Sequence, residues 1–416
     1  MRFNKSPLFQ LRDYKILLGS RWLQTFSLQF LGVIIGWQVY QLRKEALLLG
    51  LIGLTEAIPA IGGSFFAGHV VDNSRPVQIF RLGIFINTVN ALLIFLGVSA
   101  WFDTSPDFKL VVLFVGIFIS GVTRSFVSPA QFSLIPKIVP RELLSAAAAF
   151  NSSSFTLAQI LGPALGGVVY GFAGPVVAFA VPVIGLVAAL ICSLGLSKEI
   201  SVFHARHLSS GPREAMMKSI HSGLKFLWGH KVLLSTMALD MFSVLFGGAV
   251  AVLPIFADQV FHIGASGLGI LRAAPAVGSV IISAYLGLNP MKVISGGRLL
   301  FVIAGFGVCM IAFGFTTHFY LALIFLTLSG IFDGVNMVIR GTLTQLLTPD
   351  HMRGRVSSLG NVFITSSNEI GAFESGVAAQ WMGLVPSVIF GGIMTLLIVG
   401  SVYVFVPALN KTRIQT

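Results

Sequence analysis

Ionisable side chains stand inside several long apolar stretches of this sequence, where a membrane-spanning helix would carry them into lipid. They are Arg21, Glu56, Arg124, Asp240, Arg272, Asp333, Arg340, Glu369 and Glu374. A charged side chain at the bilayer centre costs about 2.5–3.5 kcal/mol on insertion scales, so the charges that are kept there are candidates for function. A carboxyl group in an apolar site that meets water from alternate sides can bind and release a proton. We therefore expect proton coupling through Asp240, Glu369, Glu374 or Asp333, with Asp240 or Glu369 first. Structural hydrogen bonding within the helix bundle is the alternative.

The basic residues in these stretches can form ion pairs with the carboxylates. Arg340 follows Asp333 by seven residues, so the two side chains share one face of a helix. An ion pair that forms when one side of a passage closes, and breaks when that side opens, would act as a gate. A static buried salt bridge would only support the fold. Both interpretations stay open for Arg124, Asp333 and Arg340, and likewise for Glu56 and Arg272.

The apolar stretches are long enough to cross a membrane. Hydrophobic residues make up 55% of the 416, charged residues make up 10%, and the mean hydropathy is +0.89. That composition leaves too little polar surface for a water-soluble protein of this length. Runs of about 20 apolar residues can cross the hydrocarbon core as helices. We place twelve such spans at 16–40, 48–70, 78–101, 110–136, 146–172, 175–196, 232–255, 266–288, 299–317, 320–347, 356–382 and 385–407.

Basic residues are distributed unevenly between the two sides of these spans. If the N-terminus is cytoplasmic, 20 of the 27 Lys and Arg fall in the tails and loops on that side, and only Arg43, Lys44 and Lys109 fall opposite. This asymmetry follows the positive-inside rule and predicts that both termini are cytoplasmic. It also explains the net charge of +12 without nucleic-acid binding. Cys192 and Cys309 lie in separate spans without metal-binding spacing, so we expect neither a metal nor a cofactor.

The sequence repeats itself. Residues 120–167 align without a gap on 329–376, which places GPALGG (162–167) on GAFESG (371–376). Residues 53–62 align on 269–278. The repeat predicts two six-helix halves, 1–196 and 232–416, joined by a cytoplasmic linker at 197–231. The linker is either an amphipathic segment on the membrane surface or a plain solvated connection.

The alignment of the halves places opposite charges at equivalent positions. Glu56 falls opposite Arg272, and Arg124 falls opposite Asp333. A duplicated bundle has its site where the halves meet and gives access to either side by rocking one half against the other. We therefore expect these charges to act in gating or proton coupling.

Four motifs resemble the major facilitator superfamily: GWQVYQL (36–42), GHVVDNSR (68–75), AQILGPALGG (158–167) and TPDHMRGRVSS (348–358). Within the superfamily, the sequence is most similar to the bacterial drug and siderophore exporter branch. The resemblance implies an all-α membrane protein with twelve transmembrane helices in two pseudo-symmetric six-helix bundles.

The second motif resembles the family's gating loop after helix 2. Gly68 and Asp72 match it, but Asn73 stands where an Arg is usual and 76–77 lack a basic pair. Asp72 and Arg75 remain as gating candidates, since a carboxylate there can stabilise a neighbouring helix N-terminus in one conformation only. A simple surface ion pair is the alternative.

The third motif resembles the helix-5 signature of antiporters, although Ala158 replaces its first Gly. Its residues are Gly162, Pro163, Gly166 and Gly167. Small residues let two helix backbones approach closely, and Pro163 removes an internal hydrogen bond. The motif favours export, with ordinary close packing as the alternative.

In the resembled family, helices 1, 4, 7 and 10 line the substrate cavity. The polar and aromatic side chains there that become candidates for substrate contact are Arg21, Gln24, Gln29, Trp37, Gln38, Phe246 and Asn336. Amides can orient a polar ligand, and aromatic rings can stack on it.

We therefore expect a monomeric secondary active transporter in the bacterial cytoplasmic membrane. It would move a small amphiphilic organic molecule of the drug or siderophore class out of the cytoplasm by proton antiport, with rocker-switch alternating access. An importer or a lipid flippase of the same fold is the alternative within transport, and a non-transporting membrane receptor is the alternative from another class. No catalytic constellation in the sequence indicates an enzyme.

Overall fold

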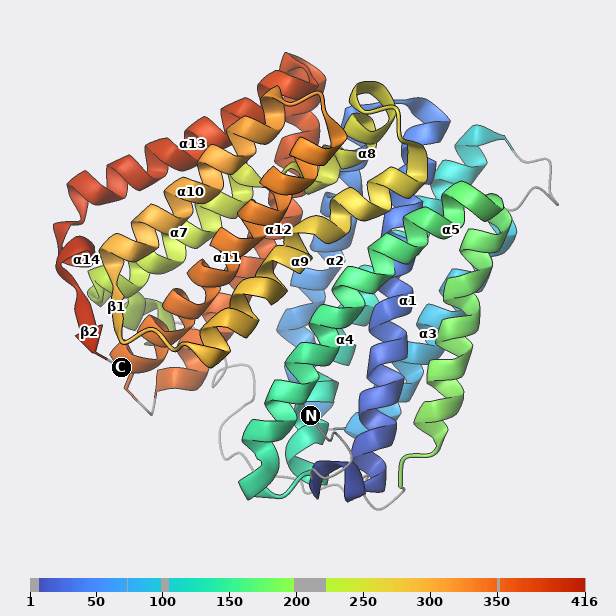
Figure 1. Cartoon of the computed structure of the whole chain (residues 1–416). Coiled ribbons are helices and arrows are strands. Elements are labelled where there is room, and N and C mark those ends of the chain that lie inside the picture. The colour runs from blue at the N-terminus through green and yellow to red at the C-terminus, as the bar shows by residue number, and fades with distance from the viewer. Residues whose placement is uncertain (1–6, 73, 99–104, 198–221, 350–351, 416) are drawn as a thin grey trace. The chain divides into compact units, whose positions relative to one another are not determined.

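The computed structural model describes residues 7–72, 74–98, 105–197, 222–349 and 352–415, and nearly all of its elements are helices (Figure 1). In chain order they are η2 (Pro7–Gln10), α1 (Arg12–Arg43), α2 (Ala46–Asp72), α3 (Pro76–Val98), α4 (Pro106–Ile138), η3 (Arg141–Leu143), α5 (Leu144–Leu194), α7 (Lys231–Gly247), η5 (Ala249–Val252), α8 (Leu253–Ile255), η6 (Phe256–Val260), α9 (Gly264–Leu288), β1 (Val293–Ser295), α10 (Gly296–Phe315), α11 (Phe319–Leu347), α12 (Arg353–Met382), α13 (Leu384–Phe405), α14 (Pro407–Lys411) and β2 (Arg413–Gln415). Within the described residues, nine helical segments are long and apolar enough to cross a membrane. Those nine do not include α1 or α12, which carry many of the polar candidates, and the number of twelve stays a prediction.

One of these segments, α5, is too long for a single crossing. At 51 residues and a rise of about 1.5 Å per residue, it would measure about 77 Å if it were straight. Its backbone breaks at Gly174, where φ is +77° and ψ is 175°, and Pro175 follows. Figure 1 shows the ribbon of α5 turning back on itself. The break falls between the predicted spans 146–172 and 175–196.

The predicted helix 232–255 is interrupted near its C-terminal end. The regular helix α7 ends at Gly247, and Gly248 has φ −83° and ψ 80°. Short turns, η5, α8 and η6, complete the segment and include Pro254 and Asp258. Two adjacent glycines lower helix propensity, and a proline removes a backbone donor, so this sequence favours short turns over one continuous helix.

The described chain forms two compact units. The first comprises Met1–Lys44, Thr55–His207 and Ile263–Ala273, and the second comprises Glu45–Leu54, Leu208–His262 and Ala274–Thr416. The halves 1–196 and 232–416 and the linker between them remain a prediction, because most of the linker lies outside the described residues.

The internal repeat is visible in how each unit packs its own helices. In the first unit, a Cβ placed on Gly121 of α4 would lie 2.8 Å from Cγ of Pro59 in α2. In the second unit, a Cβ placed on Gly330 of α11 would lie 2.5 Å from the carbonyl carbon of Pro275 in α9. The sequence alignment pairs Gly121 with Gly330 and Pro59 with Pro275. A close helix contact therefore recurs at the two positions that the sequence alignment pairs.

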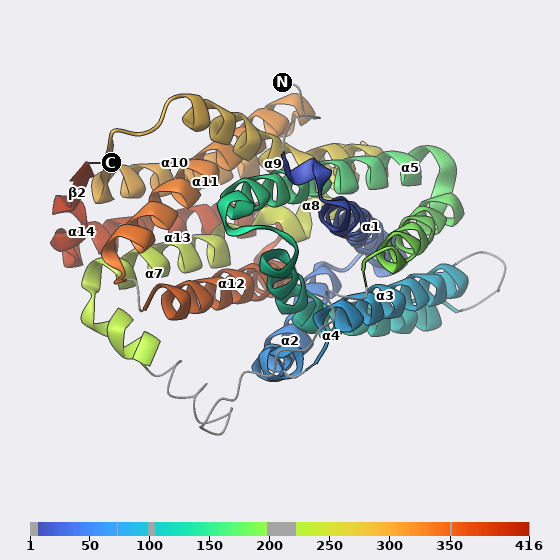
Figure 2. The ribbon, with the colours of Figure 1, turned by 90° about the horizontal axis from the view of Figure 1, so that it is seen from below.

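The C-terminal segment is fastened to the beginning of α10, an arrangement that the sequence analysis missed. Strand β2 pairs antiparallel with β1, with Ile414 opposite Ile294. The backbone N–H of Gly296 donates to the carbonyl of Thr412 at 3.1 Å. The side chain of Leu409 is fully buried in a core cluster that includes Ile294 and Leu299. Figures 1 and 2 show this segment beside the beginning of α10.

We expect Leu409→Ala to lower the free energy of unfolding by about 2–5 kcal/mol, because it empties a fully buried leucine site. Thermal unfolding of the purified protein in detergent measures the change. Lys411→Ala is the matched control, since Lys411 lies exposed in the same short helix. Equal unfolding midpoints for the two variants would contradict a structural role for this segment.

Candidate functional site

A buried ion pair joins α7 to α11 in the second unit. Nη1 of Arg340 donates to Oδ2 of Asp240, whose side chain is only 4% exposed. Nδ2 of Asn336 donates to Oδ1 of the same carboxylate at 2.7 Å. Asn336 and Arg340 lie four residues apart, about one helical turn, so α11 presents both to α7. Both carboxylate oxygens of Asp240 therefore have a donor.

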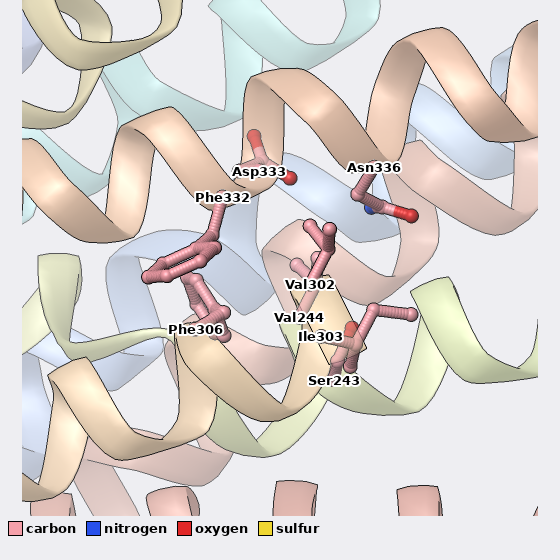
Figure 3. Close-up of a pocket in the computed structure, with 8 residues that line it drawn as sticks. All are labelled: Ser243, Val244, Val302, Ile303, Phe306, Phe332, Asp333 and Asn336. Atoms are coloured by element: carbon pink, nitrogen blue, oxygen red, sulfur yellow. The ribbon is translucent and has the colours of Figure 1, made fainter. Parts of the chain in front are cut away.

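Asp333 stands one turn before Asn336 on α11 and lines a pocket between α7, α10 and α11 (Figure 3). Asn336 is a hydrogen-bonding partner of Asp333 as well as of Asp240. We call Asp240, Asp333, Asn336 and Arg340 the acid cluster. The cluster joins two proton-coupling candidates, one gating candidate and one substrate-contact candidate, whose roles stay predictions.

The pocket beside the acid cluster is small and mostly apolar. Its lining residues are Ser243 and Val244 of α7, Val302, Ile303 and Phe306 of α10, and Phe332, Asp333 and Asn336 of α11. The cavity volume among them is about 10 Å³, which is room for about one water molecule and far below the roughly 300–1,000 Å³ of sites for drug-sized ligands. The pocket therefore has no room for a whole amphiphilic molecule.

A second ion pair lies within the first unit. Nη1 of Arg124 in α4 donates to Oε1 of Glu56 in α2 at 2.8 Å. The two side chains are 45% and 30% exposed, so this pair is far less covered by protein than Asp240 with Arg340. The sequence alignment pairs Arg124 with Asp333 and Glu56 with Arg272. The structure shows that Arg124 and Glu56 contact each other.

The carboxylates of α12 stand apart from the hydrogen bonds of Asp240 described above. Glu369 and Glu374 are both half-buried. Between them, α12 packs tightly on α7, since a Cβ on Gly371 would lie 2.9 Å from the carbonyl oxygen of Leu245. Next to Glu374, the hydroxyl of Ser375 donates to the carbonyl of Gly248 at 2.9 Å. The proton-coupling roles of Glu369 and Glu374 remain predictions.

Several polar candidates on α1 make contacts inside the first unit. Nε2 of Gln131 in α4 donates to Oε1 of Gln24 at 3.2 Å, and the hydroxyl of Tyr170 in α5 donates to Oε1 of Gln38. Trp37 is buried and packs beside Tyr40. These side chains join helices to one another, and a role in substrate contact would require such contacts to open.

The remaining substrate candidates lie in varied surroundings. Arg21 and Gln29 are half-buried on α1. Phe246 of α7 meets the ring of Phe390 in α13 edge to face, with 6.5 Å between the centroids. Arg272 is half-buried on α9.

The gating loop after α2 is described only in part. The side chain of Asp72 lies outside the described residues, whereas Arg75 is exposed. The sequence analysis missed Arg81, which donates to the carbonyls of Ser193 and Leu196 at the end of α5. A cation at a helix C-terminus is favourable, and the position of Arg81 at a span edge was the signal available.

The helix-5 motif packs α5 closely on α1, and Figure 2 shows the two helices side by side. A Cβ on Gly162 would lie 2.7 Å from Cβ of Gln29, and one on Gly166 would lie 2.6 Å from Cγ1 of Val33. A Cβ on Gly167 would lie 2.6 Å from Cα of Gly269 in α9, which belongs to the same unit. The small residues therefore serve close helix packing, and their link to antiport stays a prediction.

Comparison with known proteins gives the class of this chain. The model of the Major Facilitator Superfamily matches residues 17–372. The chain belongs to the major facilitator superfamily and is a multi-pass membrane transporter. This confirms the expected family and the expectation of a transporter rather than an enzyme.

Curated relatives and solved structures refine the comparison. The enterobactin exporter EntS of Escherichia coli O1:K1 / APEC is 25% identical over 400 residues, which cover 93% of this chain and 90% of the exporter. EntS of Shigella boydii serotype 4 matches over the same shares. A POT family transporter in complex with 5-aminolevulinic acid has a TM-score of 0.74 at 13% identity, covering 96% of this chain and 97% of that one. A D-xylose-proton symporter has a TM-score of 0.71 at 14% identity, covering 98% and 99%. These two structures confirm the major facilitator fold.

Removing one member of the buried ion pair should destabilise the protein strongly. We expect Asp240→Asn or Arg340→Gln alone to cost about 3–5 kcal/mol, because each leaves a buried charge unpaired. The double variant Asp240→Asn/Arg340→Gln should recover most of that loss. Asp107→Asn is the comparison, and its cost should be about 0–1 kcal/mol because its pair with Arg43 is exposed at the helix ends. Thermal unfolding in detergent measures all four, and additive losses in the double variant would contradict the expectation.

Replacing a glycine of the helix-5 motif with a larger residue should push α5 away from α1. We expect Gly166→Leu to cost at least about 1–3 kcal/mol, since its side chain would overlap Val33 and the carbonyl of Phe30. Gly32→Leu in α1 is the matched control, because no heavy atom lies within 4 Å of a Cβ there. The yield of monodisperse protein and its unfolding midpoint provide the measurement, and an equal effect of the two substitutions would contradict it.

Proposed function

We propose that this transporter exports a small amphiphilic organic molecule of the siderophore class, and that it exchanges this molecule for protons. The similarity to the enterobactin exporter supports the substrate class and the direction, because it extends over 93% of this chain. The helix-5 motif with Gly162, Pro163, Gly166 and Gly167 also favours export over import.

The acid cluster carries the proposal of proton coupling. Two carboxylates and one guanidinium lie together inside a membrane-spanning unit, beside a pocket with room for about one water molecule. Lipid would reject such charges, so their retention is best explained by a role in which they meet water. A proton bound from one side and released to the other would link the pocket to transport.

The wider arrangement follows from the same proposal. The two predicted halves rock to expose a substrate site alternately. The Glu56–Arg124 pair joins α2 to α4 within the first unit and moves with it. The protein lies in a bacterial cytoplasmic membrane with both termini inside, as the distribution of Lys and Arg favours.

Transport by the purified protein in proteoliposomes tests this proposal, with enterobactin as the first probe and other siderophores after it. In inside-out membrane vesicles with an acidic lumen, we expect enterobactin to accumulate in the lumen, and we expect a protonophore to abolish the accumulation. Accumulation only in right-side-out vesicles would indicate an importer. Transport that ignores the pH gradient would remove proton coupling, and transport of no siderophore would remove the substrate class.

Asp107→Asn serves as the control variant for these assays. Asp107 is 71% exposed and pairs with Arg43 between the ends of α1 and α4. Loss of one carboxylate there should leave transport unchanged.

A further inference from the structure

The two acids of the acid cluster are not equivalent. Asp240 receives hydrogen bonds on both carboxylate oxygens, one from Arg340 and one from Asn336. Protonation of Asp240 would weaken two charge-assisted hydrogen bonds and leave the guanidinium of Arg340 without its counter-ion. Asp240 is therefore held in its charged form by its own partners.

Asp333 lacks such a counter-ion. Among the described residues it makes no ion pair, and its hydrogen-bonding side-chain partner is the uncharged Asn336. It lines the pocket, whereas Asp240 does not. A proton that reaches the pocket therefore meets Asp333 first.

Within the acid cluster, Asp240, Asp333 and Arg340 together carry one negative charge in excess. Helix α11 also carries Tyr320 near its beginning, and α7 begins at Lys231. The titratable groups of the other neighbouring elements are Tyr285 on the part of α9 in this unit, Arg298 and Cys309 on α10, and Glu369 and Glu374 on the described part of α12. Arg298 stands at the beginning of α10, where it donates to the carbonyl of Val293. One added positive charge would balance the cluster.

We propose that Asp333 is the carboxylate that carries the transported proton. The proton adds to a carboxylate oxygen of Asp333 and leaves from the same atom, so no co-reactant is needed. The Asp240–Arg340 pair stays charged. This inference rests on the proposed proton exchange and names the residue that performs it.

Infrared difference spectra of the reconstituted protein, recorded between mildly acidic and mildly alkaline buffer, test the assignment without any substrate. We expect the carbonyl band of a protonated carboxylic acid in the wild type, in Asp107→Asn and in Asp240→Asn/Arg340→Gln. We expect the band to be absent in Asp333→Asn and restored in Asp333→Glu. A band that persists in Asp333→Asn, or that disappears in the double variant, would overturn the proposal.

Enterobactin transport by the same variants separates this inference from the proposed function. We expect the pH gradient to stimulate transport in the wild type and in Asp107→Asn, and not in Asp333→Asn. Stimulation that survives in Asp333→Asn would overturn the assignment while leaving proton exchange intact. A wild type that shows no stimulation would overturn both.

Discussion

An unpaired charge inside the bilayer is unfavourable. In the second unit, Asp240 and Arg340 reduce this cost by pairing with each other. That pair brings α7 and α11 together at one point and uses both oxygens of the carboxylate once Asn336 is included. Because its own charges are balanced, the pair leaves Asp333 as the acid whose charge has no direct partner. The position of Asp333 beside a pocket then gives that charge access to a proton.

Close packing of small residues sets the distances on which these contacts depend. Gly330 lets α11 approach α9 at Pro275, and Gly121 lets α4 approach α2 at Pro59 in the same way. Helices α4 and α2, which approach at Gly121, also carry the 2.8 Å contact between Arg124 and Glu56. The repeated sequence therefore builds a repeated helix contact, while the charges beside it differ between the two units.

Much of this arrangement could be predicted from the sequence, because hydropathy fixes which residues enter the membrane and the repeat fixes which helices correspond. The spacing of Asp333, Asn336 and Arg340 predicted one helix face. It could not show that Arg340 pairs with Asp240, since spacing along one helix does not reveal which other helix comes near. The pairing of β2 with β1 was missed because three-residue strands carry almost no periodic signal. The contacts of Gln24 and Gln38 with neighbouring helices could not be predicted either, because the sequence does not show which helices pack together.

Thiol labelling at the pocket tests most directly whether an uncompensated acid faces water there. Val244 lines the pocket and is half-buried, whereas Cys309 is buried on α10 outside the pocket. Val244→Cys in a Cys192→Ser background therefore carries its own internal control. Cationic and anionic methanethiosulfonate reagents of equal size would be compared in reconstituted protein. The account predicts that position 244 reacts, that Cys309 does not, and that the cationic reagent reacts faster until Asp333→Asn removes the difference. Equal rates for the two reagents, or no reaction at position 244, would contradict it.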